Sequence, residues 1–143
     1  MVLLWIIAAV SFVSSVAGKL LADHLLSRPI FLIGSFVSLQ YSTNAGVAFG
    51  ITFPGWLQAL LIAVAVTAVI ILAFHTSHSR ISSVAFGLII GGALGNIVDR
   101  IGDGVVTDFM SVGTFPIFNV ADSCITVGVC LLLIDALLKR RAR

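Results

Sequence analysis

Four of the chain's aspartates gather in one short stretch, residues 95–123. The sequence holds six acidic residues, every one an Asp, and Asp99, Asp103, Asp108 and Asp122 lie in this stretch. Two carboxyl groups brought close together cannot both ionise easily, so the pair divides into one carboxylate and one acid. That division suits peptide hydrolysis, in which the carboxylate takes a proton from water while the acid polarises the scissile carbonyl.

Asp108 and Asp122 are the candidates for such a pair. Asp122 follows FNVA, about five residues into an apolar segment, where an ionisable side chain is costly and needs a reason. Asp108 lies in the short apolar stretch GVVTDFM that leads to the same segment. The simpler alternatives are a helix-capping role for Asp122 and an ordinary loop carboxylate for Asp108.

The other aspartates have structural explanations. Asp99 ends an apolar segment, and we expect it to form an ion pair or an interface anchor. Asp103 lies between two glycines, which is typical of a solvated turn. Asp135 lies four residues before Lys139, the spacing of an ion pair on one helix face. None of these three is a catalytic candidate.

Polar partners for the candidate pair come from the same part of the chain. Asn96 precedes Asp99 and Arg100 by three and four residues, so all three share one helix face. The guanidinium of Arg100 is a fixed fork of donors that can hold a peptide carbonyl or orient a carboxylate. None of the three histidines has the spacing of a metal-ligand motif, so we expect neither a metal nor a cofactor.

The elements that must position these residues are membrane-spanning helices. The 143-residue chain is 59% hydrophobic and 10% charged, with a mean hydropathy of +1.19, whereas about a quarter of the residues in soluble domains are charged. A helix needs about 20 apolar residues to cross the hydrocarbon core. The sequence therefore predicts an all-α membrane protein with one domain, residues 1–143, and four spans. The spans lie at about residues 2–22, 55–74, 81–98 and 117–138.

Basic residues predict how these spans are oriented. Arg80 and the C-terminal KRRAR lie on one side of the membrane, against Lys19, Arg28 and Arg100 on the other. Because cytoplasmic loops carry the excess of Lys and Arg, both termini should be cytoplasmic. The aspartate-rich stretch then lies near the outer face. The basic residues form no interleaved patch, so we expect no nucleic-acid partner.

Two further patterns bear on the packing. FVSLQYST, residues 36–43, alternates apolar and polar side chains, and Asn44-Ala45-Gly46 supplies a turn after it, so we predict a strand of a small extracytoplasmic β-sheet. Gly87, Gly91 and Gly95 recur every four residues, which permits close helix contact. We also expect the small residues of this third span to leave room for a substrate segment.

Four short motifs carry a resemblance to a known family. They are NAGVAF at residues 44–49, GNIVDR at 95–100, GVVTDF at 104–109 and FNVAD at 118–122. They match, in this order, the patterns Asn-x-Gly-x-Ala-Phe, Gly-Asn-x-x-Asp-Arg, Gly-x-Val-x-Asp-Phe and Phe-Asn-x-Ala-Asp of the bacterial lipoprotein signal peptidases, or type II signal peptidases. A single motif of this length is weakly specific. Four in order, among four apolar segments, make a resemblance that covers nearly the whole chain.

The resemblance implies an aspartic endopeptidase embedded in the bacterial cytoplasmic (inner) membrane. Such an enzyme removes the signal peptide of a prolipoprotein, cutting before a diacylglyceryl-modified cysteine near the outer face. The implied partners are lipid-modified prolipoproteins and membrane lipids, and we expect a monomer. The resemblance implies that Asp108 and Asp122 are the catalytic dyad. The substrate-binding residues that it implies are Asn44, Gly46, Asn96, Arg100 and Asn119.

One motif departs from the family pattern. The usual first motif is Asp-Gln-x-x-Lys, whereas here Asp23 is followed by His24, and Ser27 takes the place of the lysine. Arg28 lies one residue further, a shift that turns a helical side chain by about 100°. We assign Asp23, like Asp99, a structural polar role. The altered motif leaves open an inactive or specialised paralogue of the same fold.

A small proton-coupled transporter is the other alternative, because transporters also carry carboxyl groups inside the membrane. A transporter is expected to place such groups near the bilayer midplane. In this chain Asn96, Asp108, Asn119 and Asp122 are all predicted toward one surface.

Overall fold

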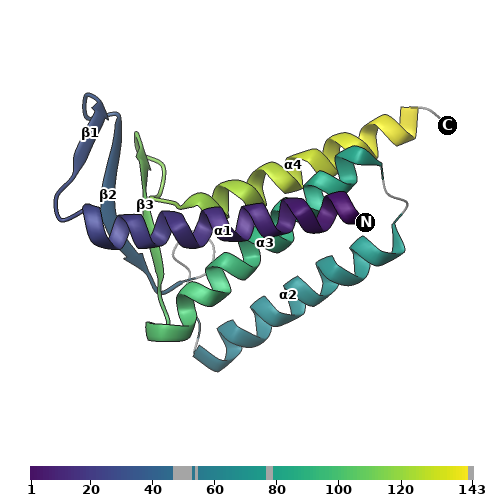
Figure 1. Cartoon of the computed structure of the whole chain (residues 1–143), viewed down its shortest axis with the longest axis horizontal. Coiled ribbons are helices and arrows are strands. Elements are labelled where there is room, and N and C mark those ends of the chain that lie inside the picture. The colour runs from purple at the N-terminus through teal and green to yellow at the C-terminus, as the bar shows by residue number, and fades with distance from the viewer. Residues whose placement is uncertain (47–52, 54, 77–78, 142–143) are drawn as a thin grey trace.

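Four helices and a three-stranded sheet form the part of the chain that the structure describes, residues 1–46, 53, 55–76 and 79–141 of a computed structural model. This architecture confirms the predicted fold class. The motif residues Val47, Ala48 and Phe49 lie outside the described residues. In chain order the elements are α1 (Val2–Leu25), β1 (Ile30–Ile33), β2 (Val37–Asn44), α2 (Gly55–His75), α3 (Arg80–Asp103), β3 (Val106–Val112) and α4 (Val120–Arg141) (Figure 1).

All four helices are long and apolar enough to cross a membrane. The 24 residues of α1 extend over about 36 Å at 1.5 Å per residue, which exceeds the roughly 30 Å hydrocarbon core. Large apolar side chains such as Val10, Leu60, Val64 and Leu133 stand exposed on the outside of the helices. An exposed apolar surface of this extent is what lipid, rather than water, would cover.

Helix α3 is the centre of the helix bundle, since it packs against α1, α2 and α4. Its glycines allow α3 to approach α1 and α4 closely. A Cβ atom added at Gly87 would lie 2.6 Å from the carbonyl oxygen of Leu4 in α1, and one added at Gly92 would lie 2.6 Å from that of Ala121 in α4. Helix backbones can approach this closely only where no side chain intervenes. The predicted close packing along the glycine stripe is therefore present.

The glycines of the stripe leave no room for a substrate segment, so for them the prediction is wrong, whereas Ala93 of the same helix lines a cavity. Gly87, Gly91 and Gly95 are covered by residues of α1, and Gly92 is covered by residues of α4. A small residue in a helix creates space only where no neighbouring backbone has moved in to fill it. The open volume lies elsewhere, between α2 and α4.

The sheet has the order β1-β2-β3, with antiparallel pairing throughout. It lies at the end of the bundle opposite the two chain termini (Figure 1). The alternating segment predicted as a strand forms β2 almost residue for residue. Sequence reasoning missed β1 and β3, because β1 is a run of only four apolar residues and β3 is the GVVTDFM stretch interpreted as a connection.

A register shift in β2 determines which of its side chains lie on the same face of the sheet as Asp108 of β3. Leu39 pairs with Met110, but Ser42 pairs with Asp108, so the register shifts by one residue between them. Since strand side chains alternate between two faces, this shift places Ser42 and Asn44, the even-numbered residues after it, on the face of Asp108. Asn44 thereby joins Asp108. An uninterrupted alternation would have placed Asn44 on the opposite face.

Helix α4 begins later than predicted. We expected the span to start near residue 117, which would place Asp122 about five residues inside it. The helix starts at Val120, and Asp122 lies in its first turn. The reason is local, because Asn119 and Asp122 exchange hydrogen bonds that cap the helix: the amide N of Asp122 donates to Asn119 Oδ1 at 2.9 Å, and the amide N of Asn119 donates to Asp122 Oδ2 at 3.2 Å.

Candidate active site

Asp108 is the most deeply buried carboxyl group of the site, with 2% of the residue exposed. It lies in β3, and both of its oxygens accept hydrogen bonds from asparagine side chains. Asn44 Nδ2 donates to Oδ2 at 3.1 Å, and Asn119 Nδ2 donates to Oδ1 at 2.9 Å. The carboxyl group is therefore held in one orientation by residues from β2 and from the residue before α4.

Asp122 is held in a similar way from the other side. Asn96 Nδ2, in α3, donates to Asp122 Oδ1 at 2.9 Å, while the backbone of Asn119 donates to Oδ2. The carboxyl group also lies at the N-terminus of α4, where the helix dipole stabilises negative charge. The capping role that we considered as the simpler alternative is thus real. The capping role does not exclude a second role for this carboxyl group, because Asp122 also lines a cavity.

Asn119 joins the two carboxyl groups. Its side-chain nitrogen donates to Asp108 and, at 3.1 Å, to Asn96 Oδ1, while its backbone nitrogen donates to Asp122. Asn119 is itself 5% exposed. One residue therefore fixes the position of Asp108 relative to Asp122, although they come from a strand and a helix separated by 14 positions in the chain.

Arg100 adds a positive charge to the same site. One guanidinium nitrogen donates to the carbonyl oxygen of Gly46 at 2.7 Å, and the other terminal nitrogen donates to that of Asn96 at 3.1 Å. The backbone N–H of Gly46 in turn donates to Asn44 Oδ1 at 2.9 Å. Within the described part of the chain, Arg100 Nε is the buried side-chain donor that has no acceptor. It is a donor available to a group that enters the site.

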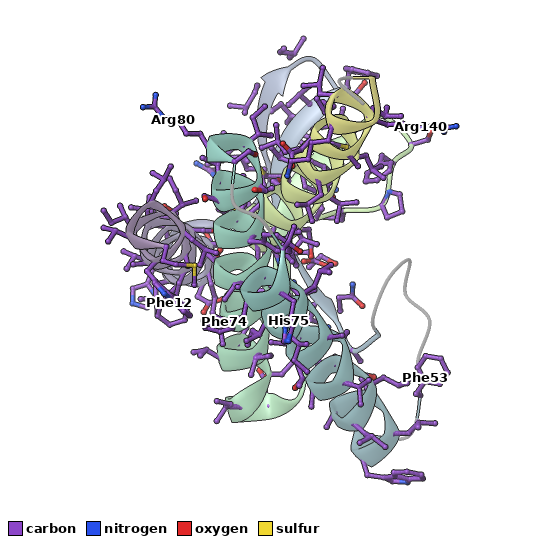
Figure 2. The ribbon with its side chains drawn as sticks, turned by 90° about the vertical axis from the view of Figure 1, so that its right-hand side faces the viewer. Phe12, Phe53, Phe74, His75, Arg80 and Arg140 are labelled. Atoms are coloured by element: carbon purple, nitrogen blue, oxygen red, sulfur yellow. The ribbon has the colours of Figure 1, made fainter. Side chains whose placement is uncertain are left out.

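The two carboxyl groups lie at the polar end of a large, mostly apolar cavity of about 810 Å³. Its walls come from α2, α3 and α4, and α2 lies apart from α4 in both views (Figures 1 and 2). Ile62 and Val66 of α2 face Ile125 and Val129 of α4 across it. At its polar end the cavity is lined by Asn44, Asn96, Arg100, Asp108 and Asp122.

Burial raises the pKa of Asp108 from its ordinary 3.8 to about 6. The hydrogen bond from Asn44 lowers this pKa, the negative charge of Asp122 raises it, and the hydrogen bond from Asn119 and the charge of Arg100 lower it. Burial is the largest of these effects because a charged carboxylate loses its hydration. The environment therefore favours Asp108 as the member of the pair that holds a proton.

The raised pKa makes the stability of the folded protein depend on pH. Since folding raises this pKa, the folded protein binds the proton more tightly than the unfolded chain does. The resulting stabilisation is complete below about pH 4 and is lost as the pH rises through about 6. Between these pH values, the free energy of unfolding of wild type should fall by on the order of 2–3 kcal/mol relative to that of Asp108→Asn. Thermal unfolding of both proteins in detergent would measure this difference in stability. Parallel pH profiles of the two proteins would contradict the prediction.

A second polar cluster lies behind the site and contains both residues to which we assigned a structural role. Lys19 Nζ lies 2.7 Å from Asp23 Oδ2 and 3.1 Å from Asp99 Oδ1. Thr107 completes the cluster, because its backbone N–H donates to Asp99 Oδ2 at 2.7 Å and its hydroxyl donates to Asp23 Oδ1 at 3.3 Å. Arg28, considered as a substitute for the missing lysine, has no ion pair among the described residues.

Sequence reasoning missed Lys19 and Thr107. A signal for Lys19 was present, because it lies four residues before Asp23, the spacing of a helical ion pair. No comparable signal exists for Thr107, whose partners Asp23 and Asp99 are 84 and 8 positions away. Asp103, predicted in a turn, is the exposed last residue of α3; it accepts a hydrogen bond from the backbone of Val105 and takes part in neither cluster.

The model of the family described as signal peptidase (SPase) II matches residues 7–138. Lipoprotein signal peptidases are among the similar proteins. The one from Chlorobium luteolum is 39% identical over 94% of this chain and 87% of its own length. The one from Symbiobacterium thermophilum is 41% identical over 98% of this chain and 95% of its own length.

A solved structure is also similar. It is a bacterial membrane enzyme determined by the in meso method at 2.3 Å resolution. It superposes with a TM-score of 0.84 at 30% sequence identity, covering 94% of this chain and 86% of that one. The likeness extends over the helices and the sheet together.

Proposed function

The chain belongs to the signal peptidase II family of membrane aspartic peptidases, which remove signal peptides from prolipoproteins, and we propose that Asp108 and Asp122 are its catalytic pair. The observation that carries this proposal is the position of Asn119. Through one side chain and one backbone N–H it binds both carboxyl groups at the end of an 810 Å³ cavity. The negative charge of Asp122 also raises the pKa of Asp108, which favours a division of the pair into an acid and a base.

The two aspartates take different roles. Asp108, whose pKa burial raises, donates a hydrogen bond from its protonated carboxyl group to the scissile carbonyl. Asp122, at the N-terminus of α4, accepts a proton from the attacking water. The tetrahedral intermediate then collapses and its C–N bond breaks. The amine leaves with the proton that Asp122 took from water, and the new carboxyl terminus is released. No metal or cofactor takes part in these steps.

The polar residues around the pair position the substrate. The unpaired Nε of Arg100 is a donor for a peptide carbonyl, and Asn44 and Asn96 keep each aspartate in a fixed orientation. Gly46 presents its carbonyl to Arg100 and so fixes the guanidinium. The apolar remainder of the cavity accepts the hydrophobic part of the precursor. We propose as the substrate a prolipoprotein carrying a diacylglyceryl-modified cysteine, cut on the N-terminal side of that cysteine.

Incubation of the purified protein with a diacylglyceryl-modified prolipoprotein tests the activity. Release of the signal peptide, seen as a loss of mass, is the expected result. A relative with the complete first motif serves as the positive control. If that relative cleaves the substrate and this protein does not, the chain is an inactive paralogue of the family.

We further propose that the chain acts as a monomer and as one peptidase domain. Its cavity and both aspartates are formed within a single copy of the chain. We expect light scattering to show a monodisperse species with one chain per detergent micelle. We expect the same species to be active. Activity confined to a larger species would contradict it.

We predict that both termini are cytoplasmic and that the active site opens near the outer face. The N-terminus, the C-terminal ends of α2 and α4 and the N-terminal end of α3 lie at one end of the bundle, and the sheet lies at the other (Figure 1). Arg80 and Arg140 project outward at the end with the termini, where basic residues favour the cytoplasm (Figure 2). Single cysteines at positions 103 and 143 should react with a membrane-impermeant thiol reagent from opposite sides. Labelling of both from one side would contradict this topology.

A further inference from the structure

Lys19 is the cation of the cluster behind the active site, and we propose that it is a positioning residue for catalysis. The sequence pattern of the family places a lysine four residues after Asp23, a position that Ser27 occupies here. Lys19 lies four residues before Asp23 instead. Position 27 lies beyond the end of α1 at Leu25, whereas Lys19 lies one helical turn before Asp23, on the same face of that helix. This inference rests on the proposed catalytic role of Asp108.

The connection to Asp108 runs through its neighbour Thr107. The two carboxylates of Asp23 and Asp99 hold Thr107 by its hydroxyl and its backbone N–H. We call these two hydrogen bonds the clamp on Thr107. Successive side chains of a strand point to opposite faces, so this clamp fixes the strand from the face opposite Asp108. α1 passes beside β3 at this end of the bundle (Figure 1). The position of Asp108 along and across β3 therefore depends on this clamp.

The clamp needs a cation. Asp99 is 9% exposed, and it shares both Lys19 and Thr107 with a second carboxylate, Asp23. Two carboxylates this close repel each other, and a buried charge that has lost its partner is strongly destabilising. Without Lys19, at least one carboxylate must take up a proton or move away. Either event weakens the hydrogen bonds to Thr107. Asp108 then occupies its catalytic position for a smaller fraction of the time.

The experiment measures kcat and KM of full-length variants with a lipid-modified prolipoprotein. Lys19→Met should lower kcat at least about 10-fold with KM changed by less than about 3-fold, because a misplaced reacting group costs rate rather than binding. Lys19→Arg, which keeps the charge, should retain kcat within about 3-fold. A purely structural role would lower the amount of folded enzyme and leave the kcat of the folded fraction unchanged.

The double variant Lys19→Met/Asp99→Asn tests the electrostatic cause. Asn at position 99 can still accept the hydrogen bond from Thr107, and no unpaired charge is left there. We expect it to fold and to recover most of the kcat lost in Lys19→Met, a non-additive result. This variant also carries the test if Lys19→Met alone does not fold. A double variant that is no better in folding or in kcat than the single one would overturn the proposal.

Two controls complete the design. Lys139→Met removes the cation of another helical ion pair, with Asp135 at 2.7 Å, and should leave kcat within about 2-fold of wild type because that pair lies at the far end of the bundle. Asp108→Asn, measured in parallel, separates the two proposals. If Asp108→Asn is inactive and Lys19→Met has wild-type kcat, the positioning proposal alone fails. If Asp108→Asn is fully active, the proposed catalytic pair fails.

Discussion

Asp108→Asn and Asp122→Asn are each expected to abolish signal-peptide cleavage while the protein stays folded. Either substitution removes the proton shared by the pair and changes the side-chain volume very little. General acid–base catalysis contributes roughly 10²–10⁴-fold, so each variant should retain less than about a hundredth of the wild-type kcat. The measurement is release of signal peptide from a lipid-modified precursor, with folding checked by thermal unfolding in the same detergent.

Asp103→Asn is the matched control, because it makes the same chemical change in the same stretch of sequence. Asp103 is exposed and accepts one hydrogen bond from the backbone of its own turn. Its substitution should leave the rate within about 2-fold of wild type, as surface changes usually do. Retention of more than about a hundredth of the rate in either dyad variant would remove that aspartate from the acid–base mechanism.

The spans could be predicted from the sequence because the requirement for a membrane helix is local. About 20 consecutive apolar residues suffice, and the chain supplies them four times. The start of α4 could not be located in the same way. It depends on the exchange of hydrogen bonds between Asn119 and Asp122, and the apolar Ile117 and Phe118 before it read as part of the span.

The candidate site was predictable as a set of residues but not as an arrangement. Motif resemblance selected Asn44, Asn96, Asp108, Asn119 and Asp122 together, and these five form one hydrogen-bonded network. That Asn119 binds both aspartates follows only from packing β3 against the start of α4. That Asn44 faces Asp108 follows from a register shift in β2, which the alternating sequence of the strand conceals.

The cluster around Lys19 shows how a departure from a family pattern can be understood structurally. Arg28, the basic residue that the sequence offers after Asp23, has no ion pair among the described residues. Helix α1 ends at Leu25, so the position one turn after Asp23 lies outside it, and Lys19 occupies the position one turn before. Lys19 also contacts Asp99, so its role depends on where Asp99 lies. That position is set by α3 rather than by α1.

The position of the proposed catalytic pair leads to an expectation about substrate choice. Asp122 lies in the first turn of α4 and Asp108 lies in the adjoining strand, so both are near one end of the spans. From there the cavity continues between apolar residues of α2 and α4, including Ile62, Val66 and Val129. A scissile peptide bond must therefore be held at the edge of the hydrocarbon core, where its polar groups do not stay unaided.

Lipid modification of the cysteine supplies this positioning. Each buried CH₂ contributes about 0.8 kcal/mol, and two acyl chains hold a segment stably at the membrane interface. The cavity of about 810 Å³ has room for part of a segment held beside the two aspartates. An unlipidated precursor can place its hydrophobic signal segment in the membrane, but its cleavage site is free to move along the membrane normal. The peptide bond then spends little time beside Asp108 and Asp122.

We therefore expect the unlipidated precursor to be cut at least about 10²-fold more slowly than the lipidated one, the scale of loss that a misplaced reacting group produces. Matched assays of the two precursors in the same detergent would measure kcat/KM for each. A third precursor, with one acyl chain in place of two, should fall between them, because a single chain anchors only marginally. Equal kcat/KM for the lipidated and unlipidated forms would show that anchoring depth does not select the substrate. Selection would then have to come from contacts of the peptide itself with groups such as Arg100.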